Sequence, residues 1–199
     1  MSLPALRMLL RRCKITLQAR SSATLKVNVG AGVSSIRGWI NLDKDLLDIT
    51  IQHDWARIFA PRSINRLLAE HVLEHLENSE VRHFLNNANE VLAPGGRIRI
   101  AVPDGLHPDK DYIDQVKPGG YGDGADDHKQ LFNYRSLTGH LESAGYQVQL
   151  LEWFDESGTF NKCDWFEEDG PVLRSAANDP RNVDQPLCYT SLIIDGKLK

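Results

Sequence analysis

Short apolar runs recur along most of this chain, separated by polar turns. The runs at residues 25–29 (LKVNV), 39–43 (WINLD) and 49–53 (ITIQH) have the length and composition of β-strands. Residues 64–69 (INRLLA) and 97–102 (RIRIAV) predict two more strands. Because the runs are short and rich in apolar residues, they favour strands of a buried sheet.

A second pattern, with apolar residues three and four apart, lies between these strands. In residues 78–92 it predicts a helix that Pro94-Gly95-Gly96 ends. Residues 134–144 predict another, closed by Gly145, and residues 33–37 leave room for a first helix of about two turns or less. Strands that alternate with helices predict an α/β fold, a mostly parallel sheet with helices on both faces.

The last part of the chain completes the sheet. Residues 146–154 and 187–194 predict a sixth and a seventh strand. Residues 105–128 are rich in Gly, Pro and Asp and predict a mobile loop, and residues 155–185 form a polar insert between the last two strands. We therefore expect a single domain over residues 25–199, preceded by an arm over residues 1–24.

The arm differs from the rest of the chain in charge. The net charge is −4, yet seven Lys or Arg residues and no acidic residue precede Asp43. The simplest interpretation is a surface helix from Leu3 to about Leu17, with Leu6, Leu9 and Leu10 packed inward. The alternative is contact with an anionic partner, although the arm has no aromatic residues between its cations and gives no strong nucleic-acid signal.

Composition excludes several classes of protein. The chain has 199 residues, 41% of them hydrophobic, as in ordinary globular domains. No apolar run approaches the roughly 20 residues of a transmembrane helix, and no secretory signal is evident, so we expect a cytoplasmic protein. The three cysteines are scattered and predict neither a disulfide framework nor a cysteine zinc site.

Residues 70–75 (EHVLEH) raise a specific question about metal binding. They contain His71, Glu74 and His75 in the H-x-x-E-H order of some zinc peptidases, in which two His four apart on one helix hold the metal. Here the pattern follows a predicted strand, so His71 falls in a turn and the helical spacing is not assured. A zinc hydrolase is therefore a minor alternative, and no resident metal is expected.

Five sequence pieces in order resemble a known family. They are VNVGAG (27–32), GWINLD (38–43), HDW (53–55), AEHVLEHL (69–76) and EVLAPGGRIRIAVPD (90–104). Together they resemble the small, type 11-like class I S-adenosylmethionine-dependent methyltransferases. The resemblance implies a Rossmann-like sheet of seven strands, the last antiparallel, and S-adenosyl-L-methionine as cofactor.

The resemblance also implies roles for particular residues at the carboxyl ends of the strands, where open α/β sheets bind ligands. Gly30, Ala31 and Gly32 would let backbone approach the cofactor, and the helix that follows would receive its carboxylate. Asp43 would bind the ribose hydroxyls. Asp54 would bind the adenine amine with Trp55 as an apolar lid, and Glu70 and His71 would face the methyl donor.

In methyl transfer the protein mainly aligns the nucleophile, the methyl carbon and the sulfur. A nearby base helps to remove the proton when the acceptor is a hydroxyl. The candidate catalytic residues are His71, Asp104 and His128, with His107 a further loop candidate. Trp165, Arg174 and Arg181 in the insert are candidates for shaping an acceptor pocket.

The acceptor class follows from motifs that the sequence lacks. It has neither an N/D-P-P-Y-type signature of nucleobase amino methylation nor a Pro-Cys pair for C5 chemistry. We therefore expect a small-molecule or glycan-like acceptor, methylated at oxygen. The alternative of a different class is a non-catalytic protein that binds S-adenosylmethionine as a scaffold.

Overall fold

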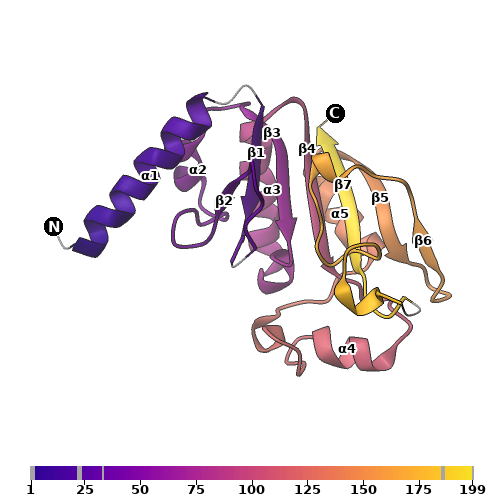
Figure 1. Cartoon of the computed structure of the whole chain (residues 1–199). Coiled ribbons are helices and arrows are strands. Elements are labelled where there is room, and N and C mark those ends of the chain that lie inside the picture. The colour runs from indigo at the N-terminus through magenta and orange to yellow at the C-terminus, as the bar shows by residue number, and fades with distance from the viewer. Residues whose placement is uncertain (1–2, 22–23, 33, 185–186, 199) are drawn as a thin grey trace.

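The protein is built on one sheet of seven strands. The computed structural model describes residues 3–21, 24–32, 34–184 and 187–198. The strand order across the sheet is β2-β1-β3-β4-β7-β5-β6 (Figure 1). The strands are β1 (Leu25–Val29), β2 (Ile40–Leu42), β3 (Ile64–Glu70), β4 (Leu92–Pro103), β5 (Tyr146–Phe154), β6 (Phe160–Lys162) and β7 (Ser191–Leu198).

Three of the six pairs of neighbouring strands in the sheet are parallel. β2, β1, β3 and β4 pair in parallel, whereas β7 runs antiparallel to both β4 and β5, and β6 runs antiparallel to β5. The predicted Rossmann-like sheet with an antiparallel last strand is confirmed. The expectation of a mostly parallel sheet is too strong, because three of the six neighbouring pairs are antiparallel.

The predicted strand at residues 49–53 is wrong. These residues form a turn, and helix α2 (Gln52–Ile58) begins inside the predicted span. The Asp48 carboxylate accepts hydrogen bonds from the backbone N–H and the hydroxyl of Thr50 at 3.0 and 2.7 Å, which satisfies the turn locally. The seventh strand is instead β6, whose three residues are too few to show a periodic pattern.

The predicted first helix is also absent, since residues 34–37 have no helical structure. Asn28 and Asn41 hold this connection in an irregular form. The Asn28 amide donates to the Ser34 carbonyl at 3.1 Å, and the Asn41 Oδ1 atom accepts from the Ile36 N–H at 2.9 Å. Side-chain amides therefore satisfy backbone groups that a helix would have paired.

Residues 105–128, predicted to be a loop without regular structure, contain helix α4 (Lys110–Val116) and a 3₁₀ turn, η2 (Ala125–Asp127). The Asp109 carboxylate caps α4 by accepting from the Asp111 N–H at 2.8 Å. Tyr112 and Val116 on α4 pack against Tyr189 near β7. In Figure 1, α4 lies beyond the end of the sheet at which β4 finishes.

Helices cover one face of the sheet. α3 (Asn78–Val91) and α5 (Tyr134–Ser143) lie behind the strands in Figure 1, with α2 beside α3. α3 buries Val81, Phe84, Leu85 and Ala88 completely, as its apolar pattern predicts. These side chains share the main core with the residues of β1, β3 and β4 that point to this face.

The opposite face is covered without long helices, so the prediction of helices on both faces is wrong. The segment between β6 and β7 lies over Leu68, Ala101 and Ile193, and Val172 from this segment is completely buried against them. Its regular structure consists of two 3₁₀ turns, η3 (Glu167–Asp169) and η4 (Pro180–Asn182). The polar insert is therefore a layer of the fold.

A buried ion pair fastens this segment to the sheet. The Arg99 guanidinium is completely buried and contacts the Asp195 carboxylate at 2.7 and 2.9 Å. It also donates to the carbonyls of Phe166 and Gly170 at 2.9 and 2.6 Å, and its charge lies 4.7 Å from the Trp165 ring centre. One side chain on β4 thus joins β7 to the covering segment.

The N-terminal helix α1 (Leu3–Ser21) extends past the edge of the sheet and contacts α2 (Figure 1). Among the described side chains of α1, Ile15 and Ala19 are buried, whereas Leu6 and Leu10, expected to pack inward, are exposed. Leu9 lies outside the described side chains. Nowhere in the described part of the chain is a helix both long and apolar enough to cross a membrane.

We predict that Arg99→Ala lowers the free energy of unfolding by about 3 kcal/mol, because it removes the buried, doubly bonded partner of Asp195 and leaves only the contact with Arg97 at 3.0 Å. Arg11 is the control: it pairs with Asp45 at 3.3 Å on the surface, so Arg11→Ala should cost about 1 kcal/mol or less. Urea denaturation measures both variants. Equal costs for the two substitutions would contradict the anchoring role of Arg99.

Asp104 joins β4 to β5 at the carboxyl end of the sheet. Its buried carboxylate accepts from the Leu106 N–H at 2.9 Å and from the Phe154 N–H at 2.8 Å. Burial raises the pKa of Asp104 to about 6, against the opposing effect of these two hydrogen bonds. As the pH rises, the Asp104 carboxyl therefore keeps its proton in the folded protein after the same carboxyl in the unfolded chain has lost its own.

The consequence is a loss of stability as pH rises from about 4 to about 6, after which the contribution is constant. We predict that between pH 4.5 and 7 wild type loses about 2 kcal/mol more unfolding free energy than Asp104→Asn, which cannot ionise. Denaturation at the two pH values tests this. A parallel pH dependence of the two proteins would show that Asp104 titrates normally.

Candidate active site

Three strands of the sheet end at the same edge and bring polar residues together there. β1 is followed by Gly30 and β2 by Asp43, and β3 ends at Glu70 and is followed by His71. Because these strands are parallel neighbours, sequence positions more than 40 residues apart meet at one edge. This arrangement forms the candidate site.

The glycine loop follows β1 and approaches the turn after β3 closely. Gly30 has a φ of +62°, and a Cβ atom there would lie 2.3 Å from a methyl carbon of Val72. Ala31 is tied to β2, since its N–H donates to the Leu42 carbonyl at 2.9 Å. Around Gly32, which has a φ of +48°, a Cβ atom would meet nothing within 4 Å. The loop therefore combines tight packing at Gly30 with open space at Gly32.

His71 occupies the turn after β3 in a left-handed conformation, with a φ of +53° that is rare for a non-glycine residue. Its N–H donates to the Ala101 carbonyl at 2.8 Å. One ring nitrogen, Nδ1, lies 3.1 Å from a Glu74 carboxylate oxygen, and the other, Nε2, lies 2.8 Å from the Ser191 hydroxyl. The ring is thus held from both sides.

Three cavities meet at His71. The first, the Asp43 cavity, has a volume of about 370 Å³. Its wall consists of Gly30, Gly32, Asp43, Lys44, Leu47, Asp48, Ile49, Thr50, His71, Val72, His75, Leu76, Glu80 and Asp127. Apolar residues and exposed carboxylates therefore line the same space.

The second, the Glu70 cavity, has about 260 Å³ and lies on the other side of the glycine loop. It is lined by Asn28, Gly30, Ala31, Gly32, Ser34, Ile36, Glu70, His71, Leu173 and Arg174. One Glu70 carboxylate oxygen accepts from the Arg174 N–H at 2.8 Å, which attaches the covering segment to the end of β3.

The third, the histidine cavity, has about 350 Å³ and a polar wall. It is lined by His71, Glu74, His75, Pro103, Gln115, Val116, Gly122, Asp123, Ala125, His128, Arg174, Arg181 and Tyr189. His71 lines all three cavities, and Gly30 and Gly32 line the first two. A ligand that spans the glycine loop would therefore reach the histidine cavity at His71.

The structure separates two predicted residues from this group. Trp55 is only 1% exposed in the core, where its ring N–H donates to the Ile49 carbonyl at 2.9 Å. Asp54 lies in the first turn of α2, pairs with Arg57 at 3.7 Å and lines a different cavity, between α1 and α2. Neither lines the Asp43 cavity; Asp48, which the sequence analysis did not single out, does.

The predicted catalytic residues are also divided. His71 and His128 both line the histidine cavity, but Asp104 is buried in its hydrogen bonds to Leu106 and Phe154 and does not. His107 stacks on Tyr112 with ring centres 4.0 Å apart, outside this cavity. Burial lowers the pKa of His107, with the charge of Asp109 acting in the opposite direction.

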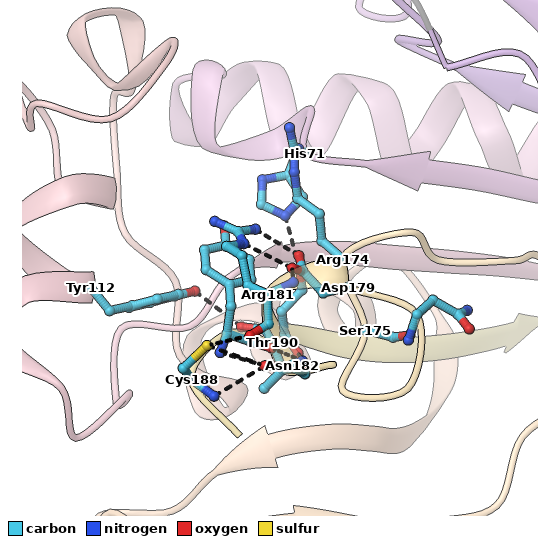
Figure 2. Close-up of polar contacts among 12 residues, drawn as sticks. His71, Tyr112, Arg174, Ser175, Asp179, Arg181, Asn182, Cys188 and Thr190 are labelled. Carbon is cyan, nitrogen blue, oxygen red and sulfur yellow. Dashed lines mark hydrogen bonds and ion pairs between the residues drawn. The ribbon is translucent and has the colours of Figure 1, made fainter. Parts of the chain in front are cut away.

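The covering segment supplies two cations to the histidine cavity. Arg181 forms a double hydrogen bond with Asp179, at 2.8 and 2.6 Å (Figure 2). Its charge lies 3.3 Å from the Tyr189 ring centre. Arg174 lines both the Glu70 and histidine cavities. Of the three insert residues singled out in the sequence, only Trp165 lies elsewhere, against Arg99.

Residues that the sequence analysis missed include Tyr112, Tyr189 and Asp179. Burial raises the pKa of Tyr112 well above its ordinary value, and the Tyr112 hydroxyl donates to the Thr190 carbonyl at 3.2 Å (Figure 2). Burial also raises the pKa of Tyr189, although Arg174 and Arg181 oppose this effect. Of the three, Tyr189 lines the histidine cavity, Tyr112 contacts the Tyr189 ring, and Asp179 pairs with Arg181. A single sequence gives no signal for these residues, because only the fold brings them together.

The geometry does not fit the zinc hydrolase alternative. His71 lies in a left-handed turn and only Leu73–His75 form a 3₁₀ turn, η1, so His71 and His75 do not share a helix. His71 does lie between the Glu74 carboxylate and the Ser191 hydroxyl, which is the order of groups in a hydrolase triad. Ser191, however, is completely buried, so its hydroxyl is not accessible as a nucleophile.

Comparisons with known proteins agree with this description of the fold. A family model described as a methyltransferase domain matches residues 25–151. No curated protein gives a significant match.

Solved structures give similar folds at low sequence identity. An S-adenosylmethionine-dependent methyltransferase from Thermotoga maritima, described as a possible histamine N-methyltransferase, is 12% identical. It matches 98% of this chain and 92% of its own with a TM-score of 0.53. Another S-adenosylmethionine-dependent methyltransferase, from Archaeoglobus fulgidus, is 15% identical over 93% of this chain and 92% of its own, with a TM-score of 0.49.

The family model covers well over half of the chain, and its matched span holds the glycine loop, Asp43 and His71. The chain therefore belongs to the methyltransferase-domain family, with the class I fold of S-adenosylmethionine-dependent methyltransferases.

Proposed function

We propose that this protein transfers a methyl group from S-adenosyl-L-methionine to a small, polar or glycan-like acceptor, at an oxygen atom. The observation that carries the proposal is that His71 lines all three cavities, so that a cofactor along the glycine loop adjoins a separate polar space. Methyl transfer needs this arrangement, because the nucleophile, methyl carbon and sulfur must align.

The residues around the glycine loop fit the cofactor. Gly30 and Gly32 leave backbone open to the Asp43 and Glu70 cavities, and the exposed Asp43 carboxylate suits two ribose hydroxyls. In place of Asp54 and Trp55, the adenine would meet Asp48 and the apolar side chains of Leu47 and Ile49.

The cofactor carboxylate requires a different partner from the one expected, since no helix follows the glycine loop in residues 34–37. Arg174 supplies a cation to the Glu70 cavity beside Gly30–Gly32. A guanidinium there would pair with the carboxylate of the methionine moiety. S-adenosyl-L-methionine supplies the electrophilic methyl group, and these residues bind and orient it.

The acceptor is proposed to occupy the histidine cavity, whose wall of His, Arg, Glu and Tyr side chains favours a polar molecule. His71 remains a candidate proton acceptor, although its Nε2 atom would first have to release the Ser191 hydroxyl. While the hydrogen bond to Ser191 is in place, the His71 ring forms the wall between the proposed cofactor and acceptor spaces.

The first test is binding of S-adenosylhomocysteine, the demethylated cofactor, to Asp43→Ala. Loss of two charge-assisted hydrogen bonds should weaken binding by about 100-fold or more in calorimetry. Asp45→Ala is the matched control, because Asp45 is an exposed aspartate two residues away that pairs with Arg11. Unchanged affinity in Asp43→Ala would contradict the ribose assignment.

The second test concerns the glycine loop. Gly30→Ala should weaken S-adenosylhomocysteine binding by about tenfold or more, because its left-handed φ and the contact with Val72 would displace the loop. Gly139, inside α5 with open space around it, is the control. Gly139→Ala should leave affinity unchanged and raise stability by about 0.5–1 kcal/mol.

Release of S-adenosylhomocysteine over a panel of hydroxyl and amine acceptors distinguishes the remaining alternatives. Turnover with hydroxyl compounds is the expected result. Cofactor binding without release across the panel would favour the scaffold alternative, and turnover restricted to amines would contradict the choice of oxygen.

A further inference from the structure

Glu74, His75 and His128 gather in the wall of the histidine cavity, and His75 also lines the Asp43 cavity. One ligand atom of each residue lies within 4.8 Å of the others. The His75 and His128 rings meet edge to face, with centres 4.7 Å apart. Within the described residues this is the group of His, Cys, Asp and Glu side chains close enough to share a metal ion.

The fold holds this cluster together through backbone contacts. The N–H of Lys129 donates to the Glu74 carbonyl at 2.7 Å, and the Gln130 side chain donates to the Leu76 carbonyl at 2.6 Å. These bonds attach the residues after η2 directly to η1. His128 is therefore fixed beside Glu74 and His75, 53 positions away in the chain.

Glu74 is the unexplained member of the group. Its carboxylate is completely buried, and neither oxygen has a hydrogen bond of good geometry to any described residue. The His71 Nδ1 atom, 3.1 Å from one carboxylate oxygen, is its near neighbour. A buried carboxylate with so few partners is unfavourable unless a cation completes the site.

Both histidines have the outer contacts that metal ligands usually have. The His128 Nδ1 atom lies 2.6 Å from the Val116 carbonyl, to which a proton on Nδ1 would be donated, and Nε2 is the nitrogen that the neutral ring offers to a metal. The His75 Nδ1 atom lies 3.6 Å from the Asp127 carboxylate. A carbonyl or carboxylate behind the ring orients an imidazole toward a metal and raises its basicity.

The surrounding charges are compatible with a cation. Of the two arginines that line the histidine cavity, Arg181 is neutralised by its double contact with Asp179. Asp123 and Asp127 line the cavities on either side of the cluster. Arg174 faces the Glu70 cavity as well, where the cofactor carboxylate would take up its charge.

We propose that Glu74, His75 and His128 bind a divalent transition-metal ion such as Zn²⁺, Mn²⁺ or Co²⁺. Two imidazoles and one carboxylate suit these ions and leave coordination positions open. This set differs from the zinc-peptidase pattern, because Glu74 is a ligand here and His71 is not. On the proposed methyl-transfer function, an acceptor oxygen in an open position would be polarised beside the cofactor.

Calorimetry with Zn²⁺ and visible absorption with Co²⁺, on full-length protein freed of metal by a chelator, test the site. Wild type should bind one ion per chain, and His128→Ala should bind it about tenfold or more weakly. His83→Ala is the matched control, because His83 is exposed on α3 and should bind as wild type does. If His128→Ala melts abnormally, His128→Gln repeats the test with a larger polar side chain.

Two results would overturn the metal site: no stoichiometric binding to wild type, or the same affinity in wild type and the folded His128 variant. S-adenosylhomocysteine binding is measured on the same samples without metal. Cofactor binding without metal binding would reject the metal site alone, and metal binding without cofactor binding would reject the proposed methyl transfer alone.

Discussion

The geometry of the site depends on one backbone reversal, at His71. β3 is a buried parallel strand, and its direction would carry the chain away from the sheet. The left-handed conformation of His71 instead folds the chain back, so that Val72 meets Gly30 and the Glu74 carboxylate comes to lie 3.1 Å from the imidazole. Such a conformation costs about 1–2 kcal/mol for a residue other than glycine. Contacts with Ala101, Glu74 and Ser191 compensate for that cost.

The sequence predicts most of the frame for a simple reason. Buried parallel strands must be apolar and amphipathic helices must be periodic, so β1, β3, α3 and α5 are visible in the residue pattern. Prediction fails where side chains satisfy the backbone. Asp48 turns residues 49–53 away from a strand, and Asn28 with Asn41 replaces a helix by an irregular connection. Neither effect has a periodic signature.

The candidate site divides in the same way. Gly30, Gly32, Asp43, Glu70 and His71 are near their expected places because they directly follow strands whose order is predictable. The resemblance makes Trp55 an apolar lid beside the adenine, but helix α2 replaces the expected strand and holds Trp55 in the core. The grouping of Glu74 with His128 depends on how α4 and η2 fold against η1, which a local pattern does not specify.

The segment between β6 and β7 has two structural roles. Through Val172 and the bonds to Arg99 it is the cover of one sheet face, and through Arg174 and Arg181 it is a wall of the site. Substitutions in this segment that reshape the histidine cavity would therefore also disturb the cover of the sheet. On the proposed function, evolution toward a new acceptor is constrained by stability here, and divergence should concentrate in α4 and η2, which line the same cavity without covering the sheet.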